Sequence, residues 1–206
     1  MASLASRRPA LRAEQDIKIA LTAPHFQVNT AGSPSLGPKE APVEIAEFAD
    51  FQCPYCKGAE IALGQVRNKY GSKIRLVYMD FPLSFHSHSL EASMAARCAG
   101  EQDKFWPYHD VLFADQSKLD PASLKTDAAK IGLDTKRFNT CFDSKKYQTA
   151  VISDRDQGMK LGLTGTPTFF LNGHELSGAQ SAPTLSSVID EELKAPTAPV
   201  KEAAAR

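Results

Sequence analysis

The sequence DFQCPYCK at residues 50–57 places two cysteines two residues apart, directly after the apolar run at residues 43–48. That run has the length and composition of a strand buried on both faces. Behind the cysteines, apolar residues recur at helical spacing as far as Tyr70, and Gly71 is a typical residue for ending a helix. Residues 73–81 predict a second strand. A strand, a helix and a strand in about 40 residues predict a right-handed parallel crossover, with the cysteine pair at its first strand-to-helix junction.

The rest of the chain predicts helices followed by a hairpin. Between residues 86 and 162 no strand-like run occurs, and the apolar spacing is helical throughout, ending in a longer helix at about residues 145–161. Asn172-Gly173 separates two short extended runs within residues 166–178, and this dipeptide is the strongest short signal for a β-hairpin. A last helix is expected at about residues 182–193. The pattern predicts an α/β fold with an all-helical segment inserted into it.

The first forty residues are the least informative part of the chain. Residues 16–21 fit either a short helix or an edge strand, and residues 32–42 are rich in Gly, Pro and Ser, which predicts a loop. Charged side chains interrupt every apolar stretch of the first twenty residues, so no signal peptide is recognised there, and nothing downstream is long enough to span a bilayer. We therefore expect a chain that is either cytosolic or already trimmed of its targeting sequence.

Composition restricts the possible partners and leaves the cysteines to be explained. The 206 residues include 24 acidic and 24 basic side chains, and the resulting zero net charge argues against a nucleic-acid or anionic-membrane partner. A chain of this length buries a core without help from disulfides. Its four cysteines therefore need a chemical role or local stapling as their explanation.

The position of Cys53 at the start of the predicted helix gives the two cysteines different chemistry. Free N–H groups and the helix dipole stabilise an anion there, so the pKa of Cys53 is expected to fall, whereas Cys56 lies one turn inside and is expected to be more buried. Cys53 is then the sulfur that attacks or is attacked, and Cys56 resolves the mixed disulfide. Pro54 and Tyr55 modulate the effect by fixing the turn and the number of N–H groups that face the sulfur. A zinc site is disfavoured because no second close pair follows, and a purely structural disulfide because its loop is too short to stabilise much.

Four stretches together resemble the DsbA-like branch of the thioredoxin-fold thiol:disulfide oxidoreductases: EFADFQCPYCK, FPLSFHSHSLEAS, CAGEQDKFWPYHDVLF and GTPTFFLNG. The resemblance covers about residues 43–193. It implies a thioredoxin-like mixed sheet flanked by helices, with an all-helical insertion. The chain would then divide into an N-terminal extension with an edge element, the thioredoxin-like domain, the insertion and a tail, at residues 1–40, 41–85 with 145–195, 86–144 and 196–206.

The resemblance also implies roles for residues outside the cysteine pair. Pro167 matches the family's cis-proline, which faces the redox pair, and the backbone of Thr166 before it would bind an extended substrate peptide by strand addition. Glu47 matches a buried acid that takes the proton from the resolving cysteine. Strand alternation does not settle this point, so an outward-facing glutamate remains the alternative.

In this family the insertion usually forms a helical lid over the active-site face. Four aromatic residues of the lid would either line a hydrophobic groove for substrates or, as such aromatics more often do, belong to the core: Phe105, Trp106, Tyr108 and Phe113.

Cys98 and Cys141 fall on apolar faces of two predicted insertion helices, and some DsbA-like relatives carry a second disulfide in this region. A structural disulfide is therefore expected, with two buried free thiols as the alternative. A bonded pair would argue for an oxidising compartment. His86 and His88 lie at a loop-to-helix junction without a third ligand nearby in the sequence, so solvated or capping roles are expected for them and a metal site is not.

The implied function is exchange of disulfides with unfolded or thiol-containing protein substrates, followed by regeneration of the cysteine pair by a redox partner. No metal or organic cofactor is needed, because the cysteine pair itself carries the electrons. A dithiol oxidase in the periplasm or another extracytoplasmic compartment is favoured over a reductase or isomerase, and a cytoplasmic location stays open. Two departures weaken the oxidase interpretation: the dipeptide is Pro-Tyr where the best-known oxidase has Pro-His, and threonine precedes the proline, as in isomerase and reductase relatives. A non-catalytic peptide-binding chaperone module is a further alternative.

Overall fold

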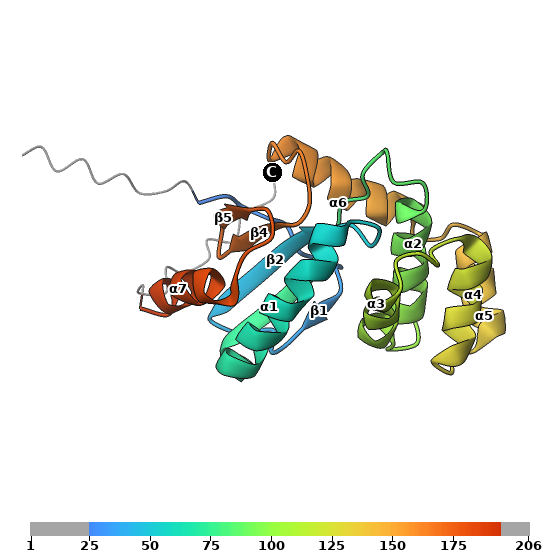
Figure 1. The fold of residues 1–206 in the computed structure, drawn as a ribbon, viewed down its shortest axis with the longest axis horizontal. Helices are drawn as coiled ribbons and strands as arrows, with labels where there is room; N and C mark the ends of the chain where they lie inside the picture. The colour runs from blue at the N-terminus through green and yellow to red at the C-terminus, as the bar shows by residue number, and fades with distance from the viewer. Residues whose placement is uncertain (1–24, 195–206) are drawn as a thin grey trace, which may run out of the picture.

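The computed structural model describes residues 25–194, and the predictions for residues 16–21 and 196–206 lie outside this range. Within the described range five strands form one mixed sheet in the order β1-β3-β2-β4-β5 (Figure 1). The central strands β2 and β3 are parallel, and the other pairs are antiparallel. The strand bounds are Ser35–Leu36 for β1, Val43–Ala49 for β2, Ile74–Asp80 for β3, Thr168–Leu171 for β4 and His174–Ser177 for β5. The expected α/β fold with a mixed sheet is confirmed.

The predicted strand, helix and strand around the cysteines are confirmed. β2 is followed by α1 (Pro54–Tyr70), and a short 3-10 turn, η1 (Gly71–Lys73), leads into β3. Gly71 has φ 54°, a left-handed conformation that costs glycine no steric penalty. Six of the seven residues in each of β2 and β3 are buried, because helices cover both faces of the sheet.

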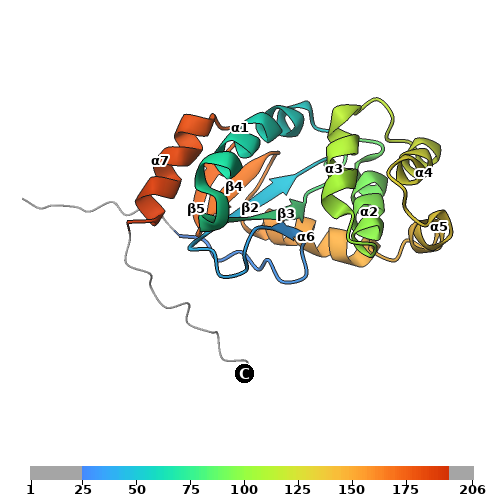
Figure 2. The same cartoon turned by 90° about the horizontal axis from the view of Figure 1, so that it is seen from below.

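One face of the sheet is covered by α1 and α7 (Ala182–Glu192), and the other by α6 (Gln148–Lys160) (Figure 2). Strand alternation decides which side chains meet which helix. The first face packs with α1 and α7 in a cluster that includes Val43, Ile45, Leu63, Leu76, Phe169, Leu185 and Ile189. The second face contributes Ala46, Phe48, Val77, Met79 and Phe170 to another cluster. Glu47 alternates with Ala46 and Phe48, so it lies on the first face, beneath α1.

The helical insertion lies on the side of the sheet away from α7 (Figures 1 and 2). Its helices are α2 (Ser89–Gly100), α3 (Phe105–Ala114), α4 (Pro121–Lys130) and α5 (Thr135–Asp143). No helix among residues 25–194 combines the length and the hydrophobicity that crossing a membrane requires.

The core of the insertion is continuous with the region around the cysteines. Cys53, Cys56 and Tyr78 belong to the same apolar cluster as residues of α2 to α5. Three of the four aromatic residues considered for a substrate groove are buried and the fourth, Trp106, is partly buried. These rings therefore belong to the core.

Arg97 of α2 fastens the insertion to the sheet. Its guanidinium, 5% exposed, donates to Asp80 at the end of β3 and to Asp154 of α6. Removing one member of such a set would leave a buried charge without a partner, which is strongly destabilising.

Strand β1 is absent from the prediction, because a loop is expected at residues 32–42. Its two residues pair with Val77 and Leu76 of β3. Gly37 follows with φ 107°, and a Cβ at this position would lie 2.5 Å from the carbonyl oxygen of Ile74. Glycine thus permits the close approach, and the strand exists through a tertiary contact that composition does not reveal.

The later boundaries follow from single residues. α6 begins at Gln148 rather than near residue 145, and Lys145 has φ 52°, which interrupts helical geometry. The Asn172-Gly173 hairpin is confirmed, with φ 47° and 93° at its two central residues.

Candidate active site

The cysteine pair lies where β2 passes into α1. Cys53 is the N-cap of the helix, with extended φ and ψ of −76° and 122°, and Pro54 is the first helical residue. Proline suits this position because its missing N–H would have no partner in the first turn. The N–H of Cys53 donates to Asp50 O at 3.0 Å, which closes the turn after the strand. The sulfur of Cys53 therefore lies at the positive end of the helix, as the sequence predicts.

Its surroundings lower the pKa of Cys53 from 9.0 to about 5. The largest cause is a hydrogen bond from the Cys56 side chain; burial opposes it, and the Thr166 side chain and the backbone N–H groups of Cys56 and Tyr55 add to the lowering. Cys53 is therefore a thiolate at neutral pH.

Cys56 has the opposite electrostatics. It is fully buried, and burial raises the pKa of its thiol far above the usual value. The hydrogen bond that it gives to Cys53 and the charge of Glu47 raise that pKa further, whereas the N–H of Asp50, 3.5 Å from its sulfur, lowers it. Both thiols are free in this structure. The anion is thus favoured at one sulfur and the neutral thiol at the other.

Thr166 and Pro167 lie against the reactive sulfur. The peptide bond between them is cis, and the sulfur of Cys53 lies 3.5 Å from Thr166 O. Pro167 is buried, whereas Pro54 and Tyr55 are exposed beside the sulfur. The chain segments at residues 53–56 and 166–167 therefore form one surface, although more than a hundred residues separate them.

Glu47 is fully buried on the sheet face beneath α1, which excludes the outward-facing arrangement. Neither of its carboxylate oxygens has a hydrogen-bond partner within the described part of the chain. Burial, followed by the negative charge of Glu60, raises the pKa of Glu47 well above the ordinary value of 4.5. Burial thus favours the neutral carboxyl of Glu47, and the group lies close enough to Cys56 for its charge to raise the pKa of that thiol.

Asp50 and Gln116 belong to the site but are missing from the sequence prediction, which gives His86 only a solvated or capping role. The carboxylate of Asp50, fully buried, accepts from the backbone N–H groups of Gln52 at 2.7 Å and Leu83 at 2.8 Å. His86 Nδ1 lies 2.8 Å from the same carboxylate. Asp50 and residues 82–86 follow neighbouring parallel strands, and the rule that the carboxyl ends of such strands meet at one edge would have placed them together.

Gln116 connects the insertion to the segment at residues 51–53, which ends at Cys53. Its side-chain amide donates to Phe51 O at 2.9 Å and to Cys53 O at 2.8 Å. These bonds fix the backbone on which the reactive sulfur is carried.

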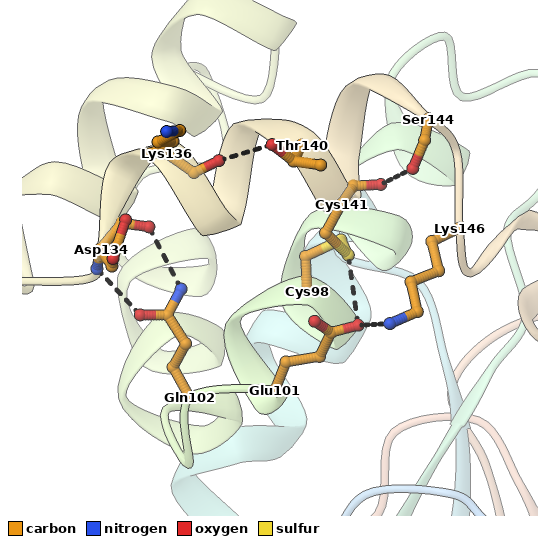
Figure 3. The surroundings of a disulfide bond; sticks show 9 residues. All are labelled: Cys98, Glu101, Gln102, Asp134, Lys136, Thr140, Cys141, Ser144 and Lys146. Carbon is orange, nitrogen blue, oxygen red and sulfur yellow. Dashed lines mark hydrogen bonds and ion pairs between the residues drawn. A yellow bond between two sulfur atoms is a disulfide. The ribbon is translucent and has the colours of Figure 1, made fainter.

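The second cysteine pair lies in the insertion. Cys98 of α2 and Cys141 of α5 form a disulfide with an S–S distance of 2.01 Å (Figure 3). Figure 3 shows Glu101 between the sulfur of Cys141, at 3.7 Å, and the ammonium of Lys146. In the part of the chain that the structure describes, no three His, Cys, Asp or Glu side chains gather as a metal site.

A family model described as thioredoxin matches residues 29–191. The chain belongs to the thioredoxin family. The structure of a thioredoxin-like oxidoreductase from Silicibacter pomeroyi superimposes with a TM-score of 0.73 at 27% identity and covers 80% of this chain and 94% of that chain. BdbD from Bacillus subtilis gives a TM-score of 0.76 at 24% identity, over 84% of this chain and 99% of BdbD. α-DsbA1 from Wolbachia pipientis gives a TM-score of 0.69 at 24% identity, and the match covers 78% of this chain and 90% of α-DsbA1. The chain therefore shares the fold of these proteins, and the neighbour at 27% identity is named as a thioredoxin-like oxidoreductase.

Longer curated proteins also match this thioredoxin-family chain. The Na(+)/H(+) antiporter NhaA 3 of Salinispora tropica is 38% identical over 154 residues, and NhaA of Herminiimonas arsenicoxydans is 34% identical over 154 residues. These matches cover 74% and 75% of this chain but 24% of each antiporter. The chain thus spans about a quarter of the length of these relatives, whose names describe the longer proteins.

Proposed function

We propose that this chain exchanges disulfides with protein substrates through Cys53 and Cys56, and that it acts as a dithiol oxidase. One observation carries the proposal: the two sulfurs are held in opposite states, Cys53 as a stabilised anion at the helix N-terminus and Cys56 as a buried neutral thiol.

The reaction begins from the oxidised Cys53–Cys56 pair. A substrate thiolate attacks the sulfur of Cys53, the Cys53–Cys56 bond breaks, and Cys56 leaves and takes up a proton. The second substrate thiolate then attacks the substrate sulfur of the mixed disulfide, and Cys53 leaves as a thiolate. Two electrons pass from the substrate to the enzyme, and one substrate disulfide forms.

Glu47 is the group that we expect to supply the proton to Cys56. A buried sulfur with a raised pKa is a poor leaving group as an anion, so its departure is assisted by a nearby acid. The neutral carboxyl of Glu47 can donate this proton, and its carboxylate can take the proton back when Cys56 attacks in the reverse direction.

The direction of transfer follows from the stability of the reduced form. At pH 7 the lowered pKa of Cys53 stabilises the dithiol state by on the order of 2 kcal/mol, equivalent to about 40 mV in a two-electron couple. This favours taking electrons from substrates. The exposed Tyr55 has no imidazolium to stabilise the thiolate of Cys53. This absence is the feature that most favours the alternative function, a reductase or isomerase of the same fold.

Substrates are expected to bind as extended peptides along Thr166 and Pro167, next to the exposed Pro54 and Tyr55. Such backbone pairing suits unfolded, thiol-containing proteins because it demands little of their sequence. A redox partner would then reoxidise the cysteine pair. The Cys98–Cys141 disulfide supports a periplasmic or other extracytoplasmic location, since structural disulfides persist in oxidising compartments.

The proposal is tested by oxidation of a reduced, unfolded protein with the wild type, Cys53→Ser and, as a matched control, the double variant C98S/C141S. The wild type and the double variant should form substrate disulfides, and Cys53→Ser should not. A Cys53→Ser protein that keeps full function would instead indicate a non-catalytic binding module. Equilibration with glutathione buffers tests the direction: an oxidase lies well above the potential of thioredoxin, about −270 mV, and a value near that figure would make the chain a reductase.

A further inference from the structure

A second group of titratable side chains lies beneath α1, on the inner side of Cys56. Glu60 follows Cys56 by four residues, so both face the same side of the helix. Glu60 Oε1 is 3.6 Å from His109 Nε2 of α3, and His109 Nδ1 is 2.9 Å from Asp110 Oδ1. Glu47 of β2 lies close enough to Glu60 for the charge of one to raise the pKa of the other. Strand β2, helix α1 and helix α3 therefore bring Glu47, Glu60 and His109 together behind Cys56.

The burial of these groups changes along the series. Glu47 is fully buried, the Glu60 side chain is 24% exposed, His109 is 1% exposed and the Asp110 side chain is 75% exposed. His109 is enclosed by the rings of Phe51, Tyr78, Phe105, Trp106 and Phe113. Its imidazole thus lies between the partly exposed Glu60 and the exposed Asp110.

Several atoms of this group lack a hydrogen-bond partner among residues 25–194. They are Glu47 Oε1 and Oε2, Glu60 Oε1, His109 Nε2 and Tyr78 Oη, the last from the residue opposite Glu47 in the β2–β3 register. Buried polar atoms are nearly always paired with protein or ordered water. With five unpaired polar atoms in one place, the ionisation of each group depends on the charges of the others.

Neighbouring charges determine how readily His109 and Glu47 ionise. Burial lowers the pKa of His109, but the carboxylates of Asp110 and Glu60 outweigh burial and raise it above 6.5. The other groups that act on this set are Tyr78 of β3, which is neutral, Asp50 and Asp80, whose charges act on Tyr78, and Arg67 of α1, whose charge acts on Asp110. The two carboxylates favour the imidazolium form of His109, and this cation opposes the charge of Glu60, which itself disfavours ionisation of Glu47.

We propose that His109 is a positioning residue for proton transfer at Cys56: it balances the charge of Glu60 and so controls when Glu47 holds the proton that Cys56 takes as it leaves. This rests on the proposed function. As the Cys53–Cys56 bond breaks, the proton passes from the Glu47 carboxyl to the sulfur of Cys56, and Glu47 becomes a carboxylate. A proton from solvent then restores the carboxyl of Glu47.

The proposal predicts shifts of opposite sign from two substitutions. The ionisation of Glu47 is followed by carbon-13 NMR in reduced protein labelled at glutamate carboxyls, with the signal assigned by its loss in Glu47→Gln. Removing the negative charge in Glu60→Gln should lower the midpoint of Glu47, and removing the positive charge in His109→Gln should raise it, each by about half to one pH unit. The double variant should return close to the wild type, and His174→Gln, a matched histidine replacement in β5, should leave the midpoint unchanged.

Activity provides the second readout. In single-turnover oxidation of a peptide with two reduced cysteines, the rate should decline above the pH at which Glu47 loses its proton. The pH of this decline should be lower in Glu60→Gln and higher in His109→Gln, in parallel with the NMR midpoint of Glu47 in each variant. His109→Lys retains a cation and should restore the wild-type midpoint. Shifts of the same sign in both variants, or no shift in either, would overturn the proposal.

The design separates failure of this inference from failure of the proposed function. Glu60→Gln leaves the aromatic rings around His109 intact, so an unchanged midpoint in this variant overturns the coupling even if His109→Gln does not fold. If the wild type does not oxidise the peptide, the proposed function fails, while the titration still decides whether the three groups are coupled.

Discussion

The two cysteine pairs of this chain contain the same side chains in opposite environments. Cys53 and Cys56 are three positions apart, and N–H groups at the start of α1 face the first sulfur. Cys98 and Cys141 are 43 positions apart, on two helices, and the carboxylate of Glu101 lies 3.7 Å from the sulfur of Cys141. A thiolate is stabilised at the first pair and opposed at the second. Reactivity is therefore set by the position of each sulfur in the fold.

The largest expected effect comes from removing the second pair. In the chain-entropy model a disulfide that closes a loop of this length stabilises by at most about 4 kcal/mol, so C98S/C141S should lose up to that amount of unfolding free energy. Urea unfolding under non-reducing conditions measures this loss. The double variant C53S/C56S, compared with reduced wild type, is the matched control and should lose less, because no cross-link is removed.

The variant C98S/C141S also tests whether the two cysteine pairs are independent. The pKa of Cys53 should be unchanged in C98S/C141S, since none of the groups that lower it belongs to the second pair. A shift of that pKa would show that the two pairs are not independent.

The acid behind Cys56 provides the second prediction, on stability against pH. The pKa of Glu47 is raised in the folded protein, so its contribution to stability is complete below the unfolded-state pKa of 4.5 and is lost as the pH rises through the folded-state value. Across this window the wild type should lose about 1.4 kcal/mol per pH unit relative to Glu47→Gln, which cannot ionise. Denaturant unfolding of both proteins from pH 4 to pH 8 tests this, and parallel curves would contradict it.

Local patterns predicted much of the fold, because the residues that set it act on their neighbours in the sequence. The strand and helix around Cys53 follow from apolar spacing, and the hairpin follows from Asn172-Gly173. β1 was missed because two residues held by pairing and by Gly37 carry no periodicity.

The site was predictable only in part for the same reason. Cys53 and Cys56 are recognised by their spacing, and Glu47, Thr166 and Pro167 were placed by resemblance to a family. The bonds from Gln116 to Cys53 and from His86 to Asp50 span 63 and 36 positions, and no local pattern indicates them. The contact of His109 with Glu60 depends in the same way on how α3 packs against α1.

The smallest predicted effect comes from replacing Thr166, one of the residues beside Cys53 that have no counterpart at the Cys98–Cys141 pair. The Thr166 side chain contributes to the lowered pKa of Cys53, so Thr166→Val should raise that pKa by about half a unit. The pH dependence of Cys53 alkylation measures the change, with Thr164→Val, an exposed threonine two residues earlier, as the control. A pKa that falls or stays constant in Thr166→Val would remove this residue from the account.

The most direct test of the central claim is the pH titration of the thiolate ultraviolet absorbance of the reduced wild-type protein. Only Cys53 should titrate in the accessible range, with a midpoint of about 5, while the Cys56 thiol stays protonated. A midpoint close to the ordinary value of 9.0 would contradict the account, because the two sulfurs would then differ in position but not in chemistry.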